Sequence, residues 1–198
     1  MKATLILILF SLTFCQEGLS GGWVKRSLAE NNIYIDRSFT SAFAEYSGEK
    51  KNYDDYIRLT VYSQIVAGTN YKVCFYDTKA EKPVVQEYVV YVPLTSWKKG
   101  PVFRVTRHNE YQASQSVNAN DESFTLVEKH LTQGLENTNE KVKSVSSILT
   151  AENSESTFYI ITADTENGKH QYIIAQDKAT KKLDYANKIK LTSYKESI

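Results

Sequence analysis

The order of secondary-structure elements predicted from hydrophobic periodicity occurs twice, and this repeat constrains the fold more than any other feature. In each half, an apolar stripe at helical spacing precedes segments in which polar and apolar residues alternate. Short words also recur at an offset of 84 to 87 residues. They are Ser38-Phe39-Thr40 with Ser123-Phe124-Thr125, Asp77-Thr78 with Asp164-Thr165, and Tyr88-Val89-Val90 with Tyr172-Ile173-Ile174. The sequence therefore predicts an α+β chain with two similar domains, residues 16–110 and 111–198, divided near Glu110.

The first half predicts one helix followed by an antiparallel meander. Apolar residues at i, i+4, i+7, i+8 and i+11 predict a helix from about Asn32 to Tyr46. Alternation with period two then predicts strands over residues 56–62 and 71–76, the first with one face buried. A run rich in Val and Tyr predicts a third strand over residues 84–92, and a fourth short run covers residues 102–106.

The second half predicts the same order. Its helical stripe consists of Phe124, Val127, Leu131, Leu135 and Val142. The strands expected after it cover residues 145–151, 158–163, 171–176 and 183–191. Asn167-Gly168 between the second and third of these strands is a strong hairpin signal.

The N-terminus has the layout of a secretory signal peptide. Met1-Lys2 supplies one cation, and Ala3–Phe14 is a mostly apolar run too short to span a bilayer. We expect residues 1–15 to be removed, and the mature chain to be secreted or routed to a lysosome or vacuole. A buried N-terminal element is the alternative. Cys74 would then be the only mature cysteine, either a small buried side chain or a reactive or intermolecular thiol.

Composition and motifs argue against several classes of function. Lys and Arg number 24 and Asp and Glu 23, so a net charge of +1 argues against a nucleic-acid binder. The mature chain has no run suited to a membrane span. The three His residues are far apart, and no HExxH, CxxC or Gly-rich phosphate loop occurs. We expect no cofactor, no metal and no enzymatic activity; a catalytic site assembled from distant residues is the least favoured alternative.

Three segments of the first half are unusual. Gly21-Gly22-Trp23 follows the predicted cleavage site, Gln64–Gly68 joins two strands, and Leu94–Trp97 joins two others. In a meander, the two connections fall at the same end of the sheet. Turns are usually polar, so apolar residues there and a Trp favour a binding edge. The alternative is that Ile65 and Val66 complete the core while Trp97 caps the end of the sheet.

Taken in order, these segments resemble the cystatins, inhibitors of papain-like cysteine proteases. Gln64-Ile65-Val66-Ala67-Gly68 matches the family pentapeptide, and the resemblance extends from Gly21 to Val105. It implies tandem cystatin-like domains, each a helix on an antiparallel sheet of about five strands. It also implies a monomer that blocks cathepsin-type proteases reversibly and competitively, without chemistry. The protease-binding residues would be Gly21, Gly22, Gln64, Ile65, Val66, Ala67, Gly68 and Trp97.

The sequence departs from the family pattern in places. Ser96 precedes Trp97 where many secreted members carry Pro, which leaves a secreted, non-inhibitory interaction protein on the same scaffold as the alternative function. Some members inhibit legumain through an Asn in the loop after the helix, where this chain has Asn52. In the second half, Leu149–Glu155 replaces the pentapeptide with an acidic, polar segment that lacks Gly. We therefore expect a degenerate cystatin-like domain that does not enter a protease cleft.

Overall fold

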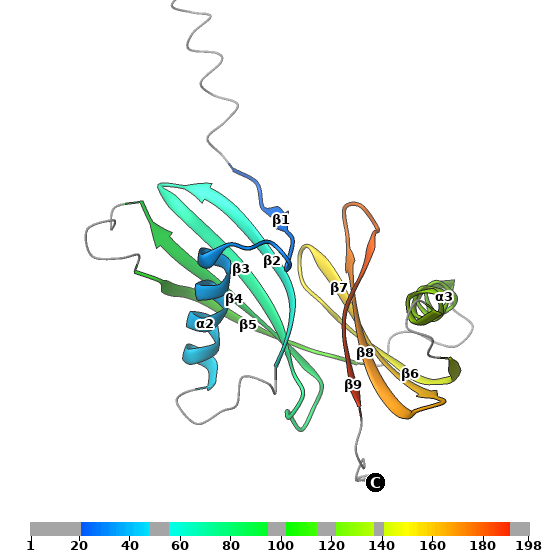
Figure 1. Cartoon of the computed structure of the whole chain (residues 1–198). Helices are drawn as coiled ribbons and strands as arrows, with labels where there is room; N and C mark the ends of the chain where they lie inside the picture. The colour runs from blue at the N-terminus through cyan, green and yellow to red at the C-terminus, as the bar shows by residue number, and fades with distance from the viewer. Residues whose placement is uncertain (1–20, 48–55, 95–101, 115–121, 137–140, 191–198) are drawn as a thin grey trace, which may run out of the picture. The chain divides into compact units, whose positions relative to one another are not determined.

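The chain is an α+β protein, and its described residues form two antiparallel sheets and two helices (Figure 1). The computed structural model describes residues 21–47, 56–94, 102–114, 122–136 and 141–190. Its elements are β1 (Val24–Arg26), α2 (Ile33–Ser47), β2 (Tyr56–Val66), β3 (Gly68–Asp77), β4 (Val84–Pro93), β5 (Arg104–Gln112), α3 (Glu122–Glu136), β6 (Val142–Glu152), β7 (Ser156–Thr165), β8 (Gly168–Asp177) and β9 (Leu183–Lys190).

The first sheet has the strand order β1-β2-β3-β4-β5 and carries α2 (Figure 1). Asn32 caps the helix, because its Oδ1 accepts a hydrogen bond of 2.9 Å from the backbone N–H of Tyr34. The predicted stripe is buried at Ile35, Phe39 and Ala42. Near the end of the helix, the Tyr46 ring meets the ring of Tyr88 on β4 edge-on, with centroids 6.3 Å apart. The predicted helix is therefore confirmed to within one residue at each end.

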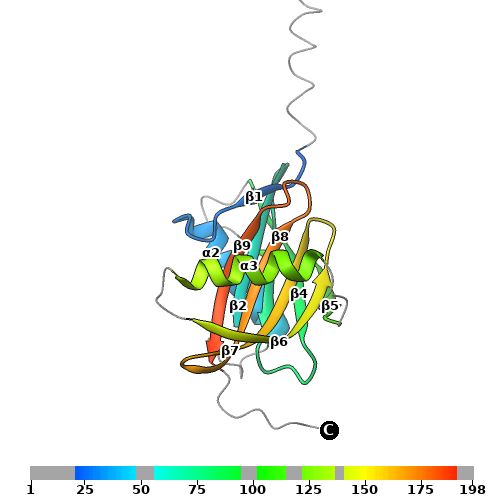
Figure 2. The same ribbon diagram turned by 90° about the vertical axis from the view of Figure 1, so that its right-hand side faces the viewer.

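The second sheet has the order β6-β7-β8-β9, and α3 lies across its strands (Figure 2). Val127 and Leu131 of the helix are buried in one cluster with sheet residues that include Ile148 and Ile161. Burial of such branched side chains stabilises the fold by about 1.5–3 kcal/mol each. The hairpin predicted at Asn167-Gly168 is present, since β7 ends at Thr165 and Gly168 begins β8 with φ +112°.

The second half differs from its prediction in two ways. Its sheet has four strands within the described residues, not about five; before α3 these residues contribute an isolated β-bridge, Ser114 with Thr150 of β6, in place of a strand such as β1. Val142 does not belong to the helical stripe: α3 ends at Glu136, and Val142 begins β6. A residue spaced for one helix face can equally start a strand when a turn intervenes.

The first half also contains two elements that differ from the prediction. The short strand β1 was not predicted, and the last strand of the sheet extends to Gln112, well beyond residue 106. Glu110 therefore lies inside β5. By contacts, the chain divides into two compact units: Met1–Lys51 with Thr60–Cys74 and Glu87–His108, and Asn52–Leu59 with Phe75–Gln86 and Asn109–Ile198.

Cys74 is fully buried in β3, which favours its interpretation as a small core side chain. Burial also raises the pKa of Tyr71 on the same strand, while the nearby Arg26 guanidinium opposes the rise. In the part of the chain that the structure describes, no helix has the length and apolar character needed to cross a membrane.

Candidate binding edge of the first sheet

The β2–β3 turn is tighter than the sequence predicted. β2 continues through Val66 and β3 begins at Gly68, so Ala67 alone lies between the strands. Gly68 has φ +148°, which side chains of L-residues rarely tolerate. A Cβ at this position would lie 2.5 Å from the carbonyl oxygen of Val92 and 2.8 Å from Cε2 of Tyr91. The positive φ and the close approach of β4 are therefore two separate reasons for glycine at this position.

Two hydrogen bonds brace this turn. The hydroxyl of Tyr91 on β4 donates to the carbonyl oxygen of Ala67 at 2.7 Å. Across the hairpin, Nδ2 of Asn70 donates to Oε1 of Gln64 at 3.2 Å. The turn is thus tied to β4, and its two strands are joined by a side-chain hydrogen bond.

The apolar side chains of the turn point away from the core. The exposed fractions of Ile65 and Val66 are 65% and 39%. This exposure contradicts the alternative in which the two side chains complete the core. An exposed, rigid apolar turn is typical of a surface that becomes buried against a partner.

The N-terminal glycines lie beside the same turn. β1 pairs antiparallel with β2, Val24 opposite Ser63 and Lys25 opposite Tyr62. Continuing this register places Gly22 opposite Ile65. A Cβ on Gly21 would lie 2.9 Å from the carbonyl oxygen of Ile65, whereas one on Gly22 would meet nothing within 4 Å. The backbone of Gly21 therefore packs directly on the backbone of the turn.

The β4–β5 connection begins at the same end of the sheet, since successive antiparallel strands reverse direction (Figure 1). Two of its described residues are apolar and exposed, Leu94 at 64% and Val102 at 47%. Trp97 and Asn52 lie outside the described residues. We call the surface formed by Gly21, Gly22, Gln64–Gly68 and Leu94 the first edge.

Sequence reasoning missed the residues that support the first edge. Tyr91 stood in a Val-rich strand without any sign that its hydroxyl reaches the neighbouring turn. Trp23 was noticed only as a neighbour of the glycines, yet Nζ of Lys72 lies 4.4 Å from the centroid of its ring. Such pairs depend on strand register, which one sequence does not reveal.

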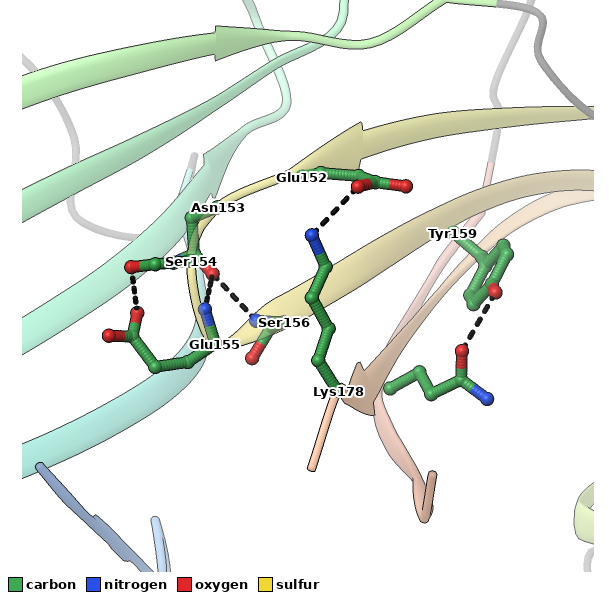
Figure 3. Close-up of polar contacts among 8 residues, drawn as sticks. Glu152, Asn153, Ser154, Glu155, Ser156, Tyr159 and Lys178 are labelled. Carbon is green, nitrogen blue, oxygen red and sulfur yellow. Dashed lines mark hydrogen bonds and ion pairs between the residues drawn. The ribbon is translucent and has the colours of Figure 1, made fainter. Parts of the chain in front are cut away.

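The corresponding end of the second sheet is polar (Figure 3). Oδ1 of Asn153 accepts hydrogen bonds from the backbone N–H groups of Glu155, at 3.0 Å, and Ser156, at 2.7 Å. Nζ of Lys178 lies 2.7 Å from Oε2 of Glu152, and the N–H of Lys178 donates to the carbonyl of Glu155. Two turns are thereby tied together. We call this surface, residues 152–156 with Lys178, the second edge.

We also searched the described residues for a metal site and for a pocket. No group of three or more His, Cys, Asp and Glu side chains in these ranges is arranged to hold a metal ion. A shallow hollow of about 380 Å³ lies between α2 and β5, lined by residues that include Tyr46, Tyr88 and His108. None of its lining residues belongs to the first edge.

Comparison of the chain with protein-family models and with curated proteins returned no match. The functional interpretation therefore depends on the residues and geometry of the two edges. The first edge offers exposed apolar side chains on a braced backbone, and the second offers paired charges.

Proposed function

We propose that the chain is a reversible, competitive inhibitor of papain-like cysteine proteases, built from tandem cystatin-like domains of which the first is inhibitory. The observation that carries the proposal is the packing of Gly21 on the backbone of Ile65. It brings two segments 44 residues apart in the sequence into one continuous edge. These are the segments through which the family resemblance implies that an inhibitor enters the protease cleft.

The first edge is suited to fill an apolar groove. Burial of exposed apolar surface on Ile65, Val66 and Leu94 gains roughly 25 cal/mol for each Å² removed from water. The hydrogen bond from Tyr91 and the close contact at Gly68 already fix the turn. Little conformational entropy is then lost on binding, so most of the gain appears as affinity.

The same geometry supports occlusion without cleavage. Gly21 and Gly22 lack side chains, so the N-terminal segment can bend along the cleft and turn away before a peptide bond reaches the nucleophile. In the turn, the hydrogen bond from Tyr91 fixes the orientation of the Ala67 carbonyl, so this peptide bond is not free to rotate into the geometry of attack. The complex would contain no covalent bond between inhibitor and protease.

Several parts of the proposal come from the sequence alone. Trp97, in the β4–β5 connection, would supply the third contact with the cleft. Removal of residues 1–15 would deliver the inhibitor to secretions or to a lysosome or vacuole, where cathepsin-type proteases act. Asn52 is the candidate residue for a second activity, inhibition of legumain.

The second domain would not enter a cleft, because its edge carries charges. Burying the Glu152–Lys178 pair would strip water from both groups, and such desolvation costs several kcal/mol per ion. The pair already satisfies its charges at the surface. We therefore assign inhibition to the first edge alone.

Titration of papain with the purified mature chain tests the proposal. We expect residual activity to fall in proportion to added inhibitor until one inhibitor is present per active site, and to return on dilution with excess substrate. Intact-mass measurement of the complex should give the two unmodified proteins. Full papain activity at micromolar inhibitor would contradict the proposal and favour a non-inhibitory interaction protein.

A further inference from the structure

The N-terminal strand is attached to the sheet by an aromatic residue and a buried cation. Nζ of Lys72 on β3 lies 4.4 Å from the centroid of the Trp23 ring. Only 1% of Lys72 is exposed. A cation within about 6 Å of an indole face is attracted by the ring quadrupole, and this attraction is stronger when water is excluded.

This contact spans three strands. Trp23 immediately precedes β1, Lys72 belongs to β3, and β2 lies between them in the sheet. By the β1–β2 register, Trp23 lies opposite Gln64, whose side chain is hydrogen-bonded to Asn70 of β3. Trp23, Gln64 and Lys72 thus occupy the same face of the sheet, because residues two apart on a strand share a face.

β1 needs such an anchor. It is three residues long, and among the described residues it lies at the edge of the sheet and pairs with β2 alone. A ladder this short frays easily, because few hydrogen bonds offset the entropy of ordering the chain. The guanidinium of Arg26 adds a hydrogen bond of 2.8 Å to the Ser63 hydroxyl at the far end of β1 from the glycines. Only Trp23 lies between β1 and the glycines.

We propose that Trp23 and Lys72 are positioning residues of the inhibitor, a clasp that holds Gly21 and Gly22 against Ile65 before the protease binds. This inference rests on the proposed function. Neither residue needs to touch the protease. The clasp acts by ordering the N-terminal segment in advance, so that this segment loses little freedom in the complex.

The clasp can be tested without a protease. The chain has two Trp residues, so Trp97→Phe leaves Trp23 as the only indole. In that background, Lys72→Met removes the cation and keeps an unbranched side chain. We expect indole emission to shift to longer wavelength, acrylamide quenching to increase and the amides of residues 24–26 to exchange faster. Lys72→Arg should preserve all three properties. Unchanged emission, quenching and exchange in Lys72→Met would overturn the clasp.

Inhibition measurements test the positioning role, with Trp97 intact. We expect Trp23→Ala and Lys72→Met each to raise the inhibition constant for papain about tenfold, and the double variant to be no weaker than the weaker single variant. Trp23→Phe and Lys72→Arg should recover most of the affinity. Ile148→Val, in the core of the second sheet, is a control that lowers stability without touching the N-terminal segment. Its inhibition constant should equal that of the unchanged chain.

The outcomes separate the two proposals. If the unchanged chain fails to inhibit papain, the proposed function and the positioning role both fail, while emission and exchange still decide whether the clasp exists. If the chain inhibits and Lys72→Met alters emission without altering the inhibition constant, only the positioning role is overturned. The positioning role is also overturned if Ile148→Val weakens inhibition as much as Lys72→Met does. The loss of affinity would then follow from lower stability alone.

Discussion

The two edges are built on strands of matching length but differ in chemistry. β2 and β6 both have 11 residues, and β3 and β7 both have 10. In the first sheet the strands are joined by Ala67 alone, next to a glycine that β4 approaches closely. In the second sheet the turn is three residues long and is closed by the side chain of Asn153. The same scaffold thus carries one turn that exposes apolar residues and another that satisfies its own polar groups.

Under the proposed function, this difference indicates how two sheets of similar build could serve different roles. A turn that is to bind a groove must expose apolar surface, and its conformation must then be fixed by residues behind it, here Gly68 and Tyr91. A turn that stays in water can be fixed from within, as Asn153 does. The experiments below test whether binding depends on the first edge alone.

The largest effect is expected from Val66→Asp. Val66 is exposed, so folding should be preserved, but the complex would bury an unpaired carboxylate at a cost of several kcal/mol. We expect the inhibition constant for papain to rise about 1,000-fold or more. Ser154→Asp, the matched change in the second edge, should leave inhibition unchanged. Equal potency of Val66→Asp and the unchanged chain would exclude the first edge from the interface.

Gly68→Ala tests the fixed conformation of the first turn. The added Cβ would meet the Val92 carbonyl at 2.5 Å, and φ is +148°. We expect stability in urea to fall by about 1–3 kcal/mol and inhibition to weaken about 100-fold, as the turn shifts away from β4. Gly168→Ala is the matched control, since Gly168 also has positive φ but open space around it. Gly168→Ala should lower stability and leave the affinity for papain unchanged. A similar loss of inhibition in both variants would show that Gly68→Ala does not act through the first turn.

Gly21→Ala compared with Gly22→Ala tests whether the N-terminal segment touches the turn. A Cβ on Gly21 would lie 2.9 Å from the backbone of Ile65, while one on Gly22 would meet open space. We expect about a tenfold weaker inhibition constant for Gly21→Ala, because the segment must move off the turn. Gly22→Ala should change affinity about twofold or less in the same assay. The reverse order would show that the register of β1 does not continue to the glycines.

Asn153→Ala should lower the stability of the chain and leave its inhibition of papain unchanged. The side chain is 5% exposed and accepts two backbone N–H groups, which would lose their partner. We expect chemical unfolding to report a loss of about 1–3 kcal/mol. Ser154→Ala, which removes an exposed hydroxyl, should change stability by about 0.5 kcal/mol or less. Weaker papain inhibition by folded Asn153→Ala would mean that the edges are not independent.

Much of the fold could be predicted, because the periodicity of apolar residues within a segment indicates its secondary structure. The stripe of Ile35, Phe39 and Ala42 located α2, and alternation located β2 and β3, since both periods follow from backbone geometry. β1 was not predicted, because three residues are too few to display a period of two. Val142 was placed on the wrong element because a spacing of seven residues fits a helix even when the helix has already ended.

The sequence by itself determined that a helix followed by strands occurs twice, that the β2–β3 connection falls within Gln64–Gly68 and that Ile65 to Ala67 are apolar. Only the tertiary structure decided that Gly21 packs on Ile65, that Tyr91 holds the Ala67 carbonyl and that Lys72 lies against Trp23. Turn chemistry and periodicity are properties of neighbouring residues. The register between strands is not a property of neighbouring residues, because it is fixed by the packing of a whole sheet against its helix. This register brings the residues of the first edge together.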